Sequence, residues 1–558
     1  MKWNIFNKTP TDSVEEIKKI LLENRGLKSK KEIEEFLNPP KPENFTAKDL
    51  DIDTKEVTKA VKRIDRAIKD KEAIIVYGDY DADGICATAI LWETLYKLNK
   101  NTMPYIPERV SEGYGLNKES INNLKSKNKN LKLIITVDHG ITAGEKIEFA
   151  KELGIDVIVC DHHQIGKEKP KATAIVHTEK VSAAAIAWFL AEKILRDKDI
   201  RILNGYLDLV AIATIADLEP LLGVNRSFAK YGLEALRKTG RPGLLAIFEE
   251  AGIKKEEIGT YHVGYIIAPR LNASGRIEHA LESLRLVCTT NKEQAKDLAE
   301  KLGRINKERQ FLTEETTRHA VESAKCKVQS AKLIFIEHET YNQGIIGLVA
   351  GKLVEEFYLP SIVISKGEIY SKASARSISG FNIIEAIRAQ SDLLVDAGGH
   401  PMAAGFTVET TKLEVLRQRL ITYADAQILP ELLEKNLRID LKLQFSALTF
   451  QLWEEIQHMS PFGLGNPEPV FMSKAIVVNW RTVGSEGRHL KLTLREQETD
   501  KDKKNVFSAI GFNLGRLASE LKVDQEIEIA YNLSLNEWNS EKHLELKLKD
   551  LQCSSPKN

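Results

Sequence analysis

The chain has 558 residues, of which 42% are hydrophobic and 29% charged, and its 80 Lys and Arg balance 80 Asp and Glu. This length exceeds what one hydrophobic core supports, so about three domains are expected, and a site for a polyanion can come only from local clustering of charge. Five scattered cysteines without a C-x-x-C pair exclude a disulfide scaffold and a thiolate zinc site, and they are typical of a reducing compartment.

The first part of the chain predicts a short helical segment followed by a parallel sheet. Residues 1–45 contain two polar helical stretches and end near the breaker Asn38–Pro42. From Glu72 onward, strand-like apolar runs (73–77, 131–137 and 155–160) alternate with helical patterns (85–98 and 143–154). This alternation predicts a parallel sheet with crossover helices over residues 46–290, in which ligands collect at the carboxyl ends of the strands.

Three further segments follow. Residues 291–325 are highly charged with apolar positions at helical spacing, which predicts one long connecting helix. Residues 326–432 predict a second α/β domain, and the closely spaced strands of 433–553 predict a small closed barrel of the OB-fold type. The expected fold class is therefore α/β multidomain: a parallel-sheet domain, a long helix, a second α/β domain and a C-terminal β-barrel.

Within the barrel region, neither the aromatic nor the basic residues single out a binding surface. Aromatic side chains there are expected in the core, and a charge run mixed with acids is expected to be solvated. The aromatic residues are Trp480, Phe512, Tyr531 and Trp538, and the basic ones are Arg481, Arg488, Lys491, Lys501, Lys503 and Lys504.

Eight metal-capable side chains occupy four clusters, each at the end of an apolar run. They are Asp79, Asp81 and Asp83 in GDYDADG, Asp138 in VDHG, Asp161, His162 and His163 in DHHQ, and Asp217 in ATIAD. Three carboxylates crowded into one turn would raise each other's pKa, so a cation is expected among them. A calcium loop of the EF-hand type is excluded, because the twelfth position counted from Asp79 is Ile90 instead of Glu.

Taken singly, the other clusters are ambiguous. Asp138 and Asp217 could each cap a helix, and a histidine at a strand end is often hydrogen-bonded to backbone. Their joint occurrence at matching positions favours a pair of Mn²⁺ or Mg²⁺ ions, which polarise phosphoryl groups and generate hydroxide. The sequence therefore predicts phosphodiester hydrolysis.

The motifs DYDADG, VDHG, DHHQ and ATIAD, in this order, resemble the DHH phosphoesterase superfamily. Later segments resemble, within it, the RecJ family of single-strand-specific 5′→3′ exonucleases. These segments are PERVSEGYGLN, PRLNASGRI, NKERQ, QGIIGLVAGKL, SARSISGFNI, DAGGHPMAAGF and PFGLGNPEPVF. The resemblance extends from about residue 45 to the C-terminus and implies DHH, DHHA1-type and OB-fold domains.

The resemblance implies two ions, usually Mn²⁺, with Mg²⁺ as a substitute. It assigns Asp79, Asp81 and Asp138 to the first ion and Asp83, Asp138, His162 and Asp217 to the second, with Asp138 bridging. The division among Asp79, Asp81 and Asp83 stays open. The implied catalytic residues are Asp138, His163 and Arg276, and the implied substrate-binding residues are Arg109, Tyr114, Arg276, Ser374, Arg376 and His400. From the residues alone, Arg276 could equally be a surface arginine and His400 a structural histidine in a glycine turn.

The expected function is Mn²⁺-dependent degradation of single-stranded DNA, 5′→3′, to mononucleotides in recombination and repair. The family implies an OB-fold that binds the strand, a monomer, and a single-strand-binding protein and a repair helicase as partners. No apolar export signal or bilayer-spanning stretch is present, so a cytoplasmic protein without membrane contact is expected. The alternatives are a phosphodiesterase of short oligonucleotides or cyclic dinucleotides, and a noncatalytic DNA-binding scaffold of the same fold. The C-terminal β region argues against the first, and the full set of ligands against the second.

Overall fold

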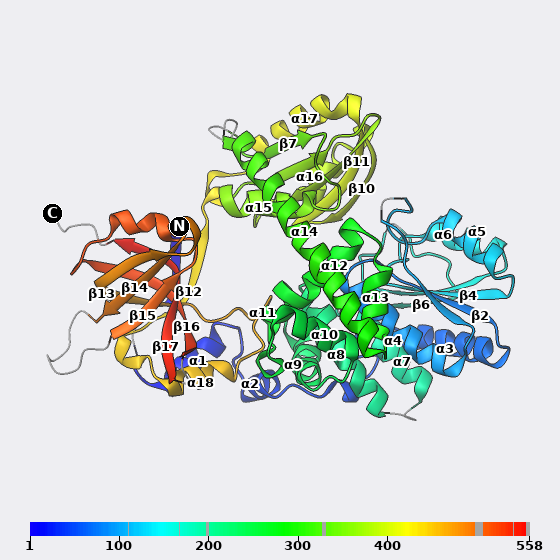
Figure 1. Cartoon of the computed structure of the whole chain (residues 1–558), viewed down its shortest axis with the longest axis horizontal. Helices are drawn as coiled ribbons and strands as arrows, with labels where there is room; N and C mark the ends of the chain where they lie inside the picture. Colours follow the sequence, from blue (N-terminus) through cyan, green and yellow to red (C-terminus); the bar gives the residue numbers. More distant parts are fainter. Residues whose placement is uncertain are drawn as a thin grey trace. The chain divides into compact units, whose positions relative to one another are not determined.

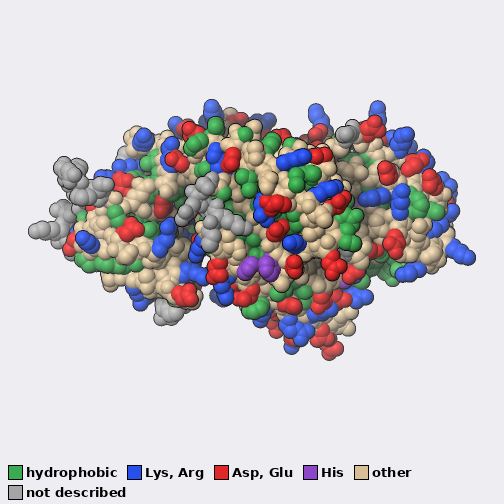
Figure 2. All heavy atoms as spheres, turned by 90° about the horizontal axis from the view of Figure 1, so that it is seen from above, with side chains coloured by type: hydrophobic (Ala, Val, Ile, Leu, Met, Phe, Trp, Pro, Cys, Tyr) green, Lys and Arg blue, Asp and Glu red, His purple; other side chains and the backbone are tan. Residues whose placement is uncertain are grey.

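The computed structural model describes residues 1–9, 11–109, 111–166, 168–196, 200–325, 331–496, 506–538 and 541–553 (Figure 1). The chain forms two compact units. The barrel unit comprises residues 1–41, 220–230 and 436–558, and the α/β unit comprises residues 42–219 and 231–435. Among the described residues, no helix is both long and apolar enough to cross a membrane. On the face drawn in Figure 2, basic and acidic side chains are interspersed.

The first sheet of the α/β unit is five-stranded and parallel throughout, in the order β3-β2-β4-β5-β6. Its strands are β2 (Ala73–Tyr77), β3 (Thr102–Tyr105), β4 (Leu131–Val137), β5 (Asp156–Asp161) and β6 (Ala174–His177). Every residue of β2 is buried, as expected for a central parallel strand covered on both faces. The helices between and beside the strands are α3 (Thr54–Lys69), α4 (Ala82–Leu98), α5 (Lys118–Lys127), α6 (Gly144–Glu152) and α7 (Ala183–Leu195). The predicted parallel sheet is confirmed.

A helical layer follows the sheet in the sequence, and its first helix, α8 (Ile200–Ala216), packs against α4 and α7. The apolar stretch before Asp217 is thus a helix. The layer continues with α9 (Gly223–Arg237), α10 (Pro242–Ala251), α11 (Thr260–His262), a π-helical turn (Val263–Ile267), α12 (Ala268–Ile277) and α13 (Leu281–Cys288).

The long connecting helix is confirmed as α14 (Lys292–Lys325), which has 34 residues and is about 50 Å long at 1.5 Å per residue. Its first half buries residues such as Leu302 and Ile305 and packs against α10, α12 and α13. Its far end buries Ala320 and Ala324 and packs against α15 (Ile346–Phe357). Both ends are therefore held by packing, so α14 is a strut inside the α/β unit.

The second sheet has the order β10-β11-β9-β8-β7 and is antiparallel except for the β7–β8 pair. Its strands are β7 (Ile334–His338), β8 (Ser361–Ser365), β9 (Tyr370–Arg376), β10 (Leu394–His400) and β11 (Ala403–Glu409), accompanied by α16 (Ile383–Arg388) and α17 (Leu413–Gln427). The glycine-rich segment before His400 lies in strand β10 instead of a turn, because Gly398 and Gly399 pair with β11. Gly399 has φ +144°, and a Cβ there would lie 2.4 Å from the Ala403 carbonyl oxygen, so only glycine fits.

The barrel unit contains the predicted closed barrel. In the sheet order β1-β12-β13-β14-β15-β17-β16, an extra pairing of β13 with β16 closes a five-stranded barrel, which confirms the OB-fold prediction. The strands are β1 (Lys2–Asn7), β12 (Asn436–Lys442), β13 (Phe471–Val483), β14 (His489–Arg495), β15 (Val506–Gly511), β16 (Glu526–Trp538) and β17 (Glu541–Cys553).

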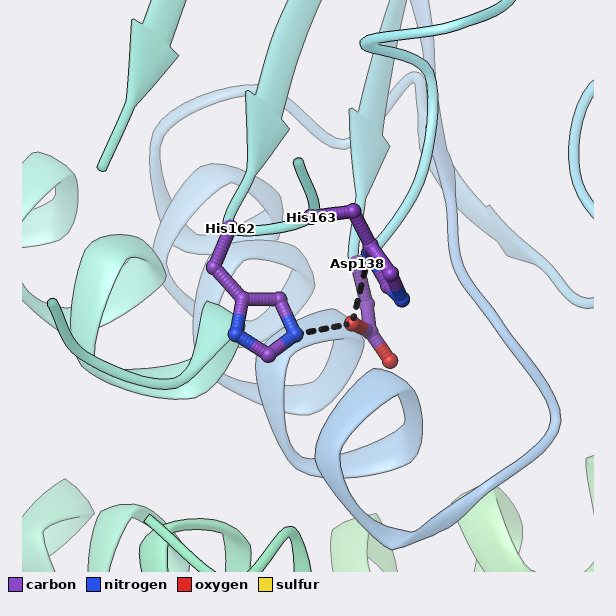
Figure 3. A group of neighbouring side chains, drawn as sticks. All are labelled: Asp138, His162 and His163. Atoms are coloured by element: carbon purple, nitrogen blue, oxygen red, sulfur yellow. Dashed lines mark ion pairs between the residues drawn. The ribbon is translucent and has the colours of Figure 1, made fainter. Parts of the chain in front are cut away.

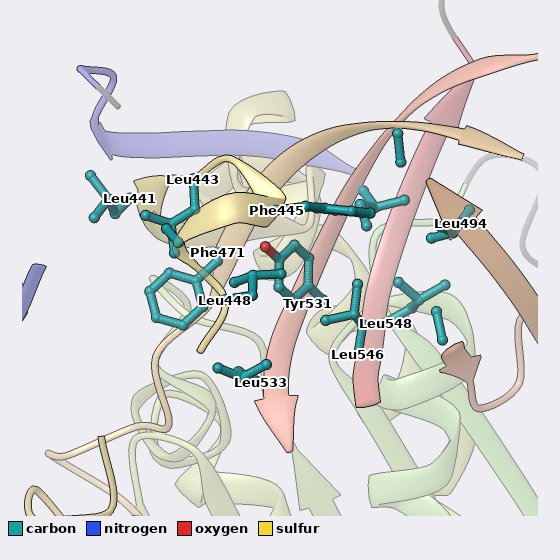
Figure 4. Close-up of a cluster of buried hydrophobic side chains, with 14 of the residues drawn as sticks. Leu441, Leu443, Phe445, Leu448, Phe471, Leu494, Tyr531, Leu533, Leu546 and Leu548 are labelled. Carbon is teal, nitrogen blue, oxygen red and sulfur yellow. The ribbon is translucent and has the colours of Figure 1, made fainter. Parts of the chain in front are cut away.

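The barrel core is built around Phe445, Phe471 and Tyr531 (Figure 4). The buried Tyr531 hydroxyl lies 2.7 Å from the Ser473 hydroxyl, so its polar end is satisfied. Tyr531 is thus in the core, as predicted, and Trp480 packs against the core while partly exposed. The core prediction is wrong for Phe512, which is 57% exposed because it follows β15 in a turn. The Trp538 side chain and Lys501, Lys503 and Lys504 lie outside the described residues.

Segments far from residue 436 complete the barrel unit. The predicted N-terminal helices are present as α1 (Val14–Glu23) and α2 (Lys30–Leu37), accompanied by α18 (Phe450–Gln457). Strand β1, which was not predicted, pairs in parallel with β12. Residues 220–230 also belong here, because the guanidinium of Arg226 donates to the carbonyl oxygens of Phe36, Met459 and Ser460.

Candidate active site

Four chain segments meet at the carboxyl edge of the parallel sheet. The acidic loop follows β2, Asp138 follows β4, and His162 and His163 follow β5, so the three strand ends deliver their side chains to one edge. Asp138 has φ +67°, and its peptide N–H donates to the Cys160 carbonyl of β5. Asp217 comes from the helical layer, directly after α8. The structure thus brings together the six residues predicted as metal ligands.

His162 lies at the centre of this group. Its Nε2 is 3.1 Å from Asp138 Oδ1, 3.8 Å from Asp83 Oδ2 and 3.7 Å from Asp217 Oδ2 (Figure 3 shows the pair with Asp138). One set of ligand atoms within 4.8 Å of one another comes from Asp83, His162 and Asp217, and another from Asp79, Asp81 and Asp138. Because Asp138 also contacts His162, it lies between the two sets. A third such set comes from Asp138, His162 and His163, so Asp138 and His162 each belong to two of the sets.

The carboxylates are charged groups in an environment that penalises charge. Asp79, Asp83 and Asp138 are each at most 3% exposed. Burial, and then the neighbouring Asp81, raise the pKa of Asp79 and of Asp138 well above the ordinary value. Burial likewise raises the pKa of Asp83 to about 6 and that of Asp217 to about 8. Asp79 Oδ1 is buried without a hydrogen-bond partner. A hard cation would compensate for this crowding, so the donor set fits Mn²⁺ or Mg²⁺.

Two helix N-termini orient the acidic residues. Both oxygens of Asp83 accept hydrogen bonds of 2.7 Å from the peptide N–H groups of Ala183 and Ala184, at the start of α7. Asp81 caps α4 by accepting from the peptide N–H of Gly84 at 3.0 Å. These contacts hold both carboxylates in place, and the two peptide N–H groups of α7 favour the charged form of Asp83.

Asp161 belongs to the cluster in the sequence but has a different role in the structure. It accepts hydrogen bonds from the peptide N–H groups of Ile141, His162 and His163, and from Nδ1 of the His163 ring at 2.8 Å. Burial acts to raise the pKa of Asp161, but the hydrogen bonds outweigh it and lower the pKa well below the usual range. Its oxygens are thus taken, and Asp161 orients His163.

The other edge of the His163 ring faces two predicted substrate-binding residues. His163 Nε2 is 3.3 Å from the Tyr114 hydroxyl, which also donates to the Asp138 carbonyl oxygen at 2.9 Å. The His400 ring lies parallel to the His163 ring, with 6.3 Å between ring centroids. The end of β10 therefore reaches the catalytic edge of the first sheet within the α/β unit.

Four arginines converge beside the carboxylates. Burial, and then the positive charges of Arg109, Arg309 and Arg376, lower the pKa of Arg276 to about 10. The four arginines come from four elements: Arg109 from the loop after β3, Arg276 from α12, Arg309 from α14 and Arg376 from β9. Arg276 also donates to the Gly344 carbonyl oxygen at 3.0 Å. We call this group the arginine cluster; guanidinium groups gathered in this way suit a phosphate, which each can bind through two parallel hydrogen bonds.

Two of these arginines are positioned by neighbours. The Arg109 guanidinium lies over the Tyr80 ring, 4.9 Å from its centroid. On β9, Ser374 and Arg376 share one face, as the alternation of a strand predicts, and Arg376 Nη1 lies 3.4 Å from Ser374 Oγ. The structure therefore places Ser374 next to a member of the arginine cluster.

Reasoning from the sequence missed three residues of this site: Asp161 as the partner of His163, Arg309 and Glu219. Arg309 has a buried Nε without a hydrogen-bond partner, and its Nη2 donates to Asn306 Oδ1 at 2.9 Å. Its signal was present, since it lies in the NKERQ segment. Glu219 Oε1 is 3.4 Å from His162 Nδ1. Nothing in the local pattern distinguishes Glu219 from an ordinary surface glutamate.

Family models match three parts of the chain. Residues 73–214 match the DHH family, N-terminal domain, residues 327–426 the DHHA1 domain, and residues 439–550 the RecJ OB domain. The first two matches lie in the α/β unit and the third in the barrel unit. The three matches agree with the expected order of domains.

Curated relatives named single-stranded-DNA-specific exonuclease RecJ match along most of the chain. The Bacillus subtilis relative is 38% identical over 90% of this chain and 64% of its own length, so the chain spans less than two thirds of that protein. The Thermus thermophilus relative is 32% identical over 89% of this chain and 71% of its own length. The Escherichia coli relative is 29% identical over 88% of this chain and 89% of its own length.

Solved structures of the same name share the fold. The crystal structure of Thermus thermophilus RecJ in complex with Mn²⁺ is similar with a TM-score of 0.83 and 29% identity, covering 99% of this chain and 80% of that one. The structure of that protein in complex with Mg²⁺ gives a TM-score of 0.77 and 28% identity, covering 99% and 79%. With the site geometry and the three domain matches, these similarities show that the chain belongs to the RecJ family of single-stranded-DNA-specific exonucleases.

Proposed function

We propose that this protein is an exonuclease that degrades single-stranded DNA from its 5′ end to mononucleotides, using two Mn²⁺ ions, or Mg²⁺ in their place. The observation that carries the proposal is that sets of potential metal ligands, joined by Asp138, lie next to a cluster of four arginines. The ions, when bound, would activate a water molecule and withdraw charge from the scissile phosphate. Asp79, Asp81 and Asp138 would hold one ion, and Asp83, Asp138, His162 and Asp217 the other.

His163 would act on the leaving group. Its Nδ1 donates to Asp161 and lies 4.0 Å from Asp138 Oδ1, whereas its Nε2 faces the Tyr114 hydroxyl. With Nδ1 engaged by Asp161, Nε2 is the ring nitrogen that would contact the substrate. In 5′→3′ hydrolysis the bond to the 3′ oxygen of the terminal nucleotide breaks, and His163 would donate a hydrogen bond or a proton to that oxygen.

The arginine cluster would bind the phosphates. Arg276 and Arg309 would neutralise the scissile phosphate. Arg109, Ser374 and Arg376 would hold the 5′-terminal phosphate and stop the strand from threading further, which makes the cleavage exonucleolytic. His400 and Tyr114 would contact the terminal nucleotide beside His163.

The remaining parts of the proposal concern the polymer and its context. The closed barrel of the barrel unit would bind the strand nonspecifically, as OB-folds do through basic grooves and base stacking. This favours a long polymer over a short oligonucleotide or cyclic dinucleotide. We further propose a cytoplasmic monomer that serves recombination and repair with a single-strand-binding protein and a repair helicase.

Digestion of end-labelled single strands tests the proposal. We expect 5′-labelled strands to release labelled mononucleotide at once and 3′-labelled strands to shorten gradually, only when Mn²⁺ or Mg²⁺ is present. Asp138→Asn, which suits the positive φ of this position, should abolish cleavage, whereas the exposed Asp297→Ala serves as a matched control with full activity. Undiminished cleavage by Asp138→Asn, or release of mononucleotide from the 3′ end first, would contradict the proposal.

A further inference from the structure

The two ring nitrogens of His162 face different carboxylates. Nε2 points to the cluster, with Asp138 Oδ1 at 3.1 Å. Nδ1 points away from it, toward Glu219 Oε1 at 3.4 Å. The side chains of His162 and Glu219 are each only 11% exposed, so water competes little for this contact. Because Nδ1 and Nε2 lie on different edges of the ring, Glu219 stands behind His162 and outside the set of ligand atoms that surrounds Nε2.

The end of α8 places Glu219 there. The peptide N–H of Asp217 still donates to the Ala213 carbonyl, as within the helix. Leu218 then takes a left-handed conformation with φ +58°, and the peptide N–H of Glu219 folds back onto the Thr214 carbonyl at 3.1 Å. After this turn Asp217 and Glu219, two residues apart, approach the same imidazole from its two nitrogen edges.

We propose that Glu219 is a positioning residue for His162. It accepts a hydrogen bond from Nδ1–H of His162, which keeps the proton on Nδ1. The Nε2 lone pair is then directed to the ion that Asp83, Asp138 and Asp217 would hold. The inference rests on the proposed function. A neutral histidine can bind a cation through Nε2 only when its proton is on Nδ1, and an acceptor behind Nδ1 holds both this tautomer and the ring orientation. The negative charge of Glu219 also makes the imidazole a more basic ligand.

Binding of Mn²⁺ alone to the full chain tests the inference, measured by isothermal titration calorimetry and by the electron paramagnetic resonance signal of free Mn²⁺. We expect two binding steps in the unchanged protein. Glu219→Ala should weaken one step about 10–100-fold, the usual effect of losing such a partner, and leave the other unchanged. Glu219→Gln should weaken it less, because its amide oxygen still accepts from Nδ1. The exposed Glu300→Ala on α14 is the matched control.

Nuclease activity gives a second readout. If Glu219 acts by positioning a ligand, the lost activity of Glu219→Ala should return as the Mn²⁺ concentration is raised; activity that stays low at saturating Mn²⁺ overturns the inference. Equal Mn²⁺ affinity of Glu219→Ala and the unchanged protein also overturns it, while leaving the proposed function intact. Failure of the unchanged protein to bind Mn²⁺ overturns both. Thermal melting without metal checks that each variant is folded. If Glu219→Ala does not fold, Glu219→Leu takes its place, because leucine fills the space but cannot accept a hydrogen bond from Nδ1.

Discussion

His163 donates from Nδ1 to Oδ1 of Asp161 over 2.8 Å, although both residues belong to one short motif of metal-capable side chains. The same carboxylate accepts three peptide N–H groups. A carboxylate with all these partners has little capacity left for a cation. Asp161 therefore orients His163, whereas Asp138 and Asp217 face the proposed ions. The two histidines that follow it also differ: His162 faces the carboxylates and His163 faces Tyr114.

Replacing Asp161 should separate metal binding from catalysis. Asp161→Asn keeps the shape of the side chain, but its NH2 group faces at least one N–H donor that it cannot accept from. We therefore expect a loss of about 1–3 kcal/mol in the free energy of unfolding. Activity should fall about 10²–10⁴-fold if His163 acts as a general acid, whereas Mn²⁺ affinity should stay unchanged. Calorimetry, urea unfolding and single-strand digestion measure the three quantities. Activity equal to that of the unchanged protein would contradict the role of Asp161.

The pH range of that loss follows from the direction of the pKa shift. The pKa of Asp161 is lowered on folding, so its stabilising contribution is present above its unfolded pKa of about 3.9 and is lost only as pH falls toward its folded pKa. The destabilisation by Asp161→Asn should therefore be equal at pH 6 and pH 8.

Metal ions should stabilise the protein more at high pH than at low pH. Folding raises the pKa of Asp83 to about 6 and that of Asp217 to about 8. Groups with raised pKa contribute stability that is present below their unfolded pKa and lost as pH rises through their folded pKa. Without metal, the melting temperature should therefore fall as pH rises from 5.5 to 8.5. Bound Mn²⁺ compensates the repulsion between the ionised carboxylates. The difference between the melting temperatures in Mn²⁺ and in EDTA should therefore increase over this pH range. A constant gap would contradict the coupling.

Arg226 should be a main determinant of the stability of the barrel unit. It is 1% exposed and lies over the Phe36 ring, and its guanidinium donates to the carbonyl groups of four residues. Arg226→Met keeps most of the volume but removes these hydrogen bonds, and among the described residues only the Met459 and Pro461 carbonyl groups keep the Asn466 amide as a donor. We expect a loss of about 3 kcal/mol or more, because a hydrogen bond to a charged group contributes about 1.5–3 kcal/mol.

Urea unfolding followed by tryptophan fluorescence measures the loss. Arg419→Met is the matched control: Arg419 pairs with Asp392 at the surface of the α/β unit, with both side chains at least 47% exposed. Such pairs contribute about 0–1 kcal/mol. Equal losses in the two variants would show that burial of Arg226 adds nothing.

The local pattern of the chain was sufficient for most of the fold. Runs such as 73–77 and 131–137 are apolar and β-branched, and helical spacing between them implies crossover helices, so the parallel sheet follows from short stretches. Strand β1 escaped detection because its partner β12 begins more than 400 residues later. The exposure of Phe512 was mispredicted because a single aromatic residue in a turn belongs to no periodic pattern that would show which way its side chain faces.

By itself, the sequence determined that Asp79, Asp138, His162 and Asp217 lie at the ends of buried elements, because a motif and the element it ends are neighbours in the chain. Only the tertiary structure decided that Asp161 turns its oxygens to backbone and His163, that Arg309 joins three other arginines, and that Glu219 stands behind His162. The physical reason is that such roles depend on which side-chain atom faces which partner. That choice is made by packing between elements distant in sequence, which local periodicity does not encode.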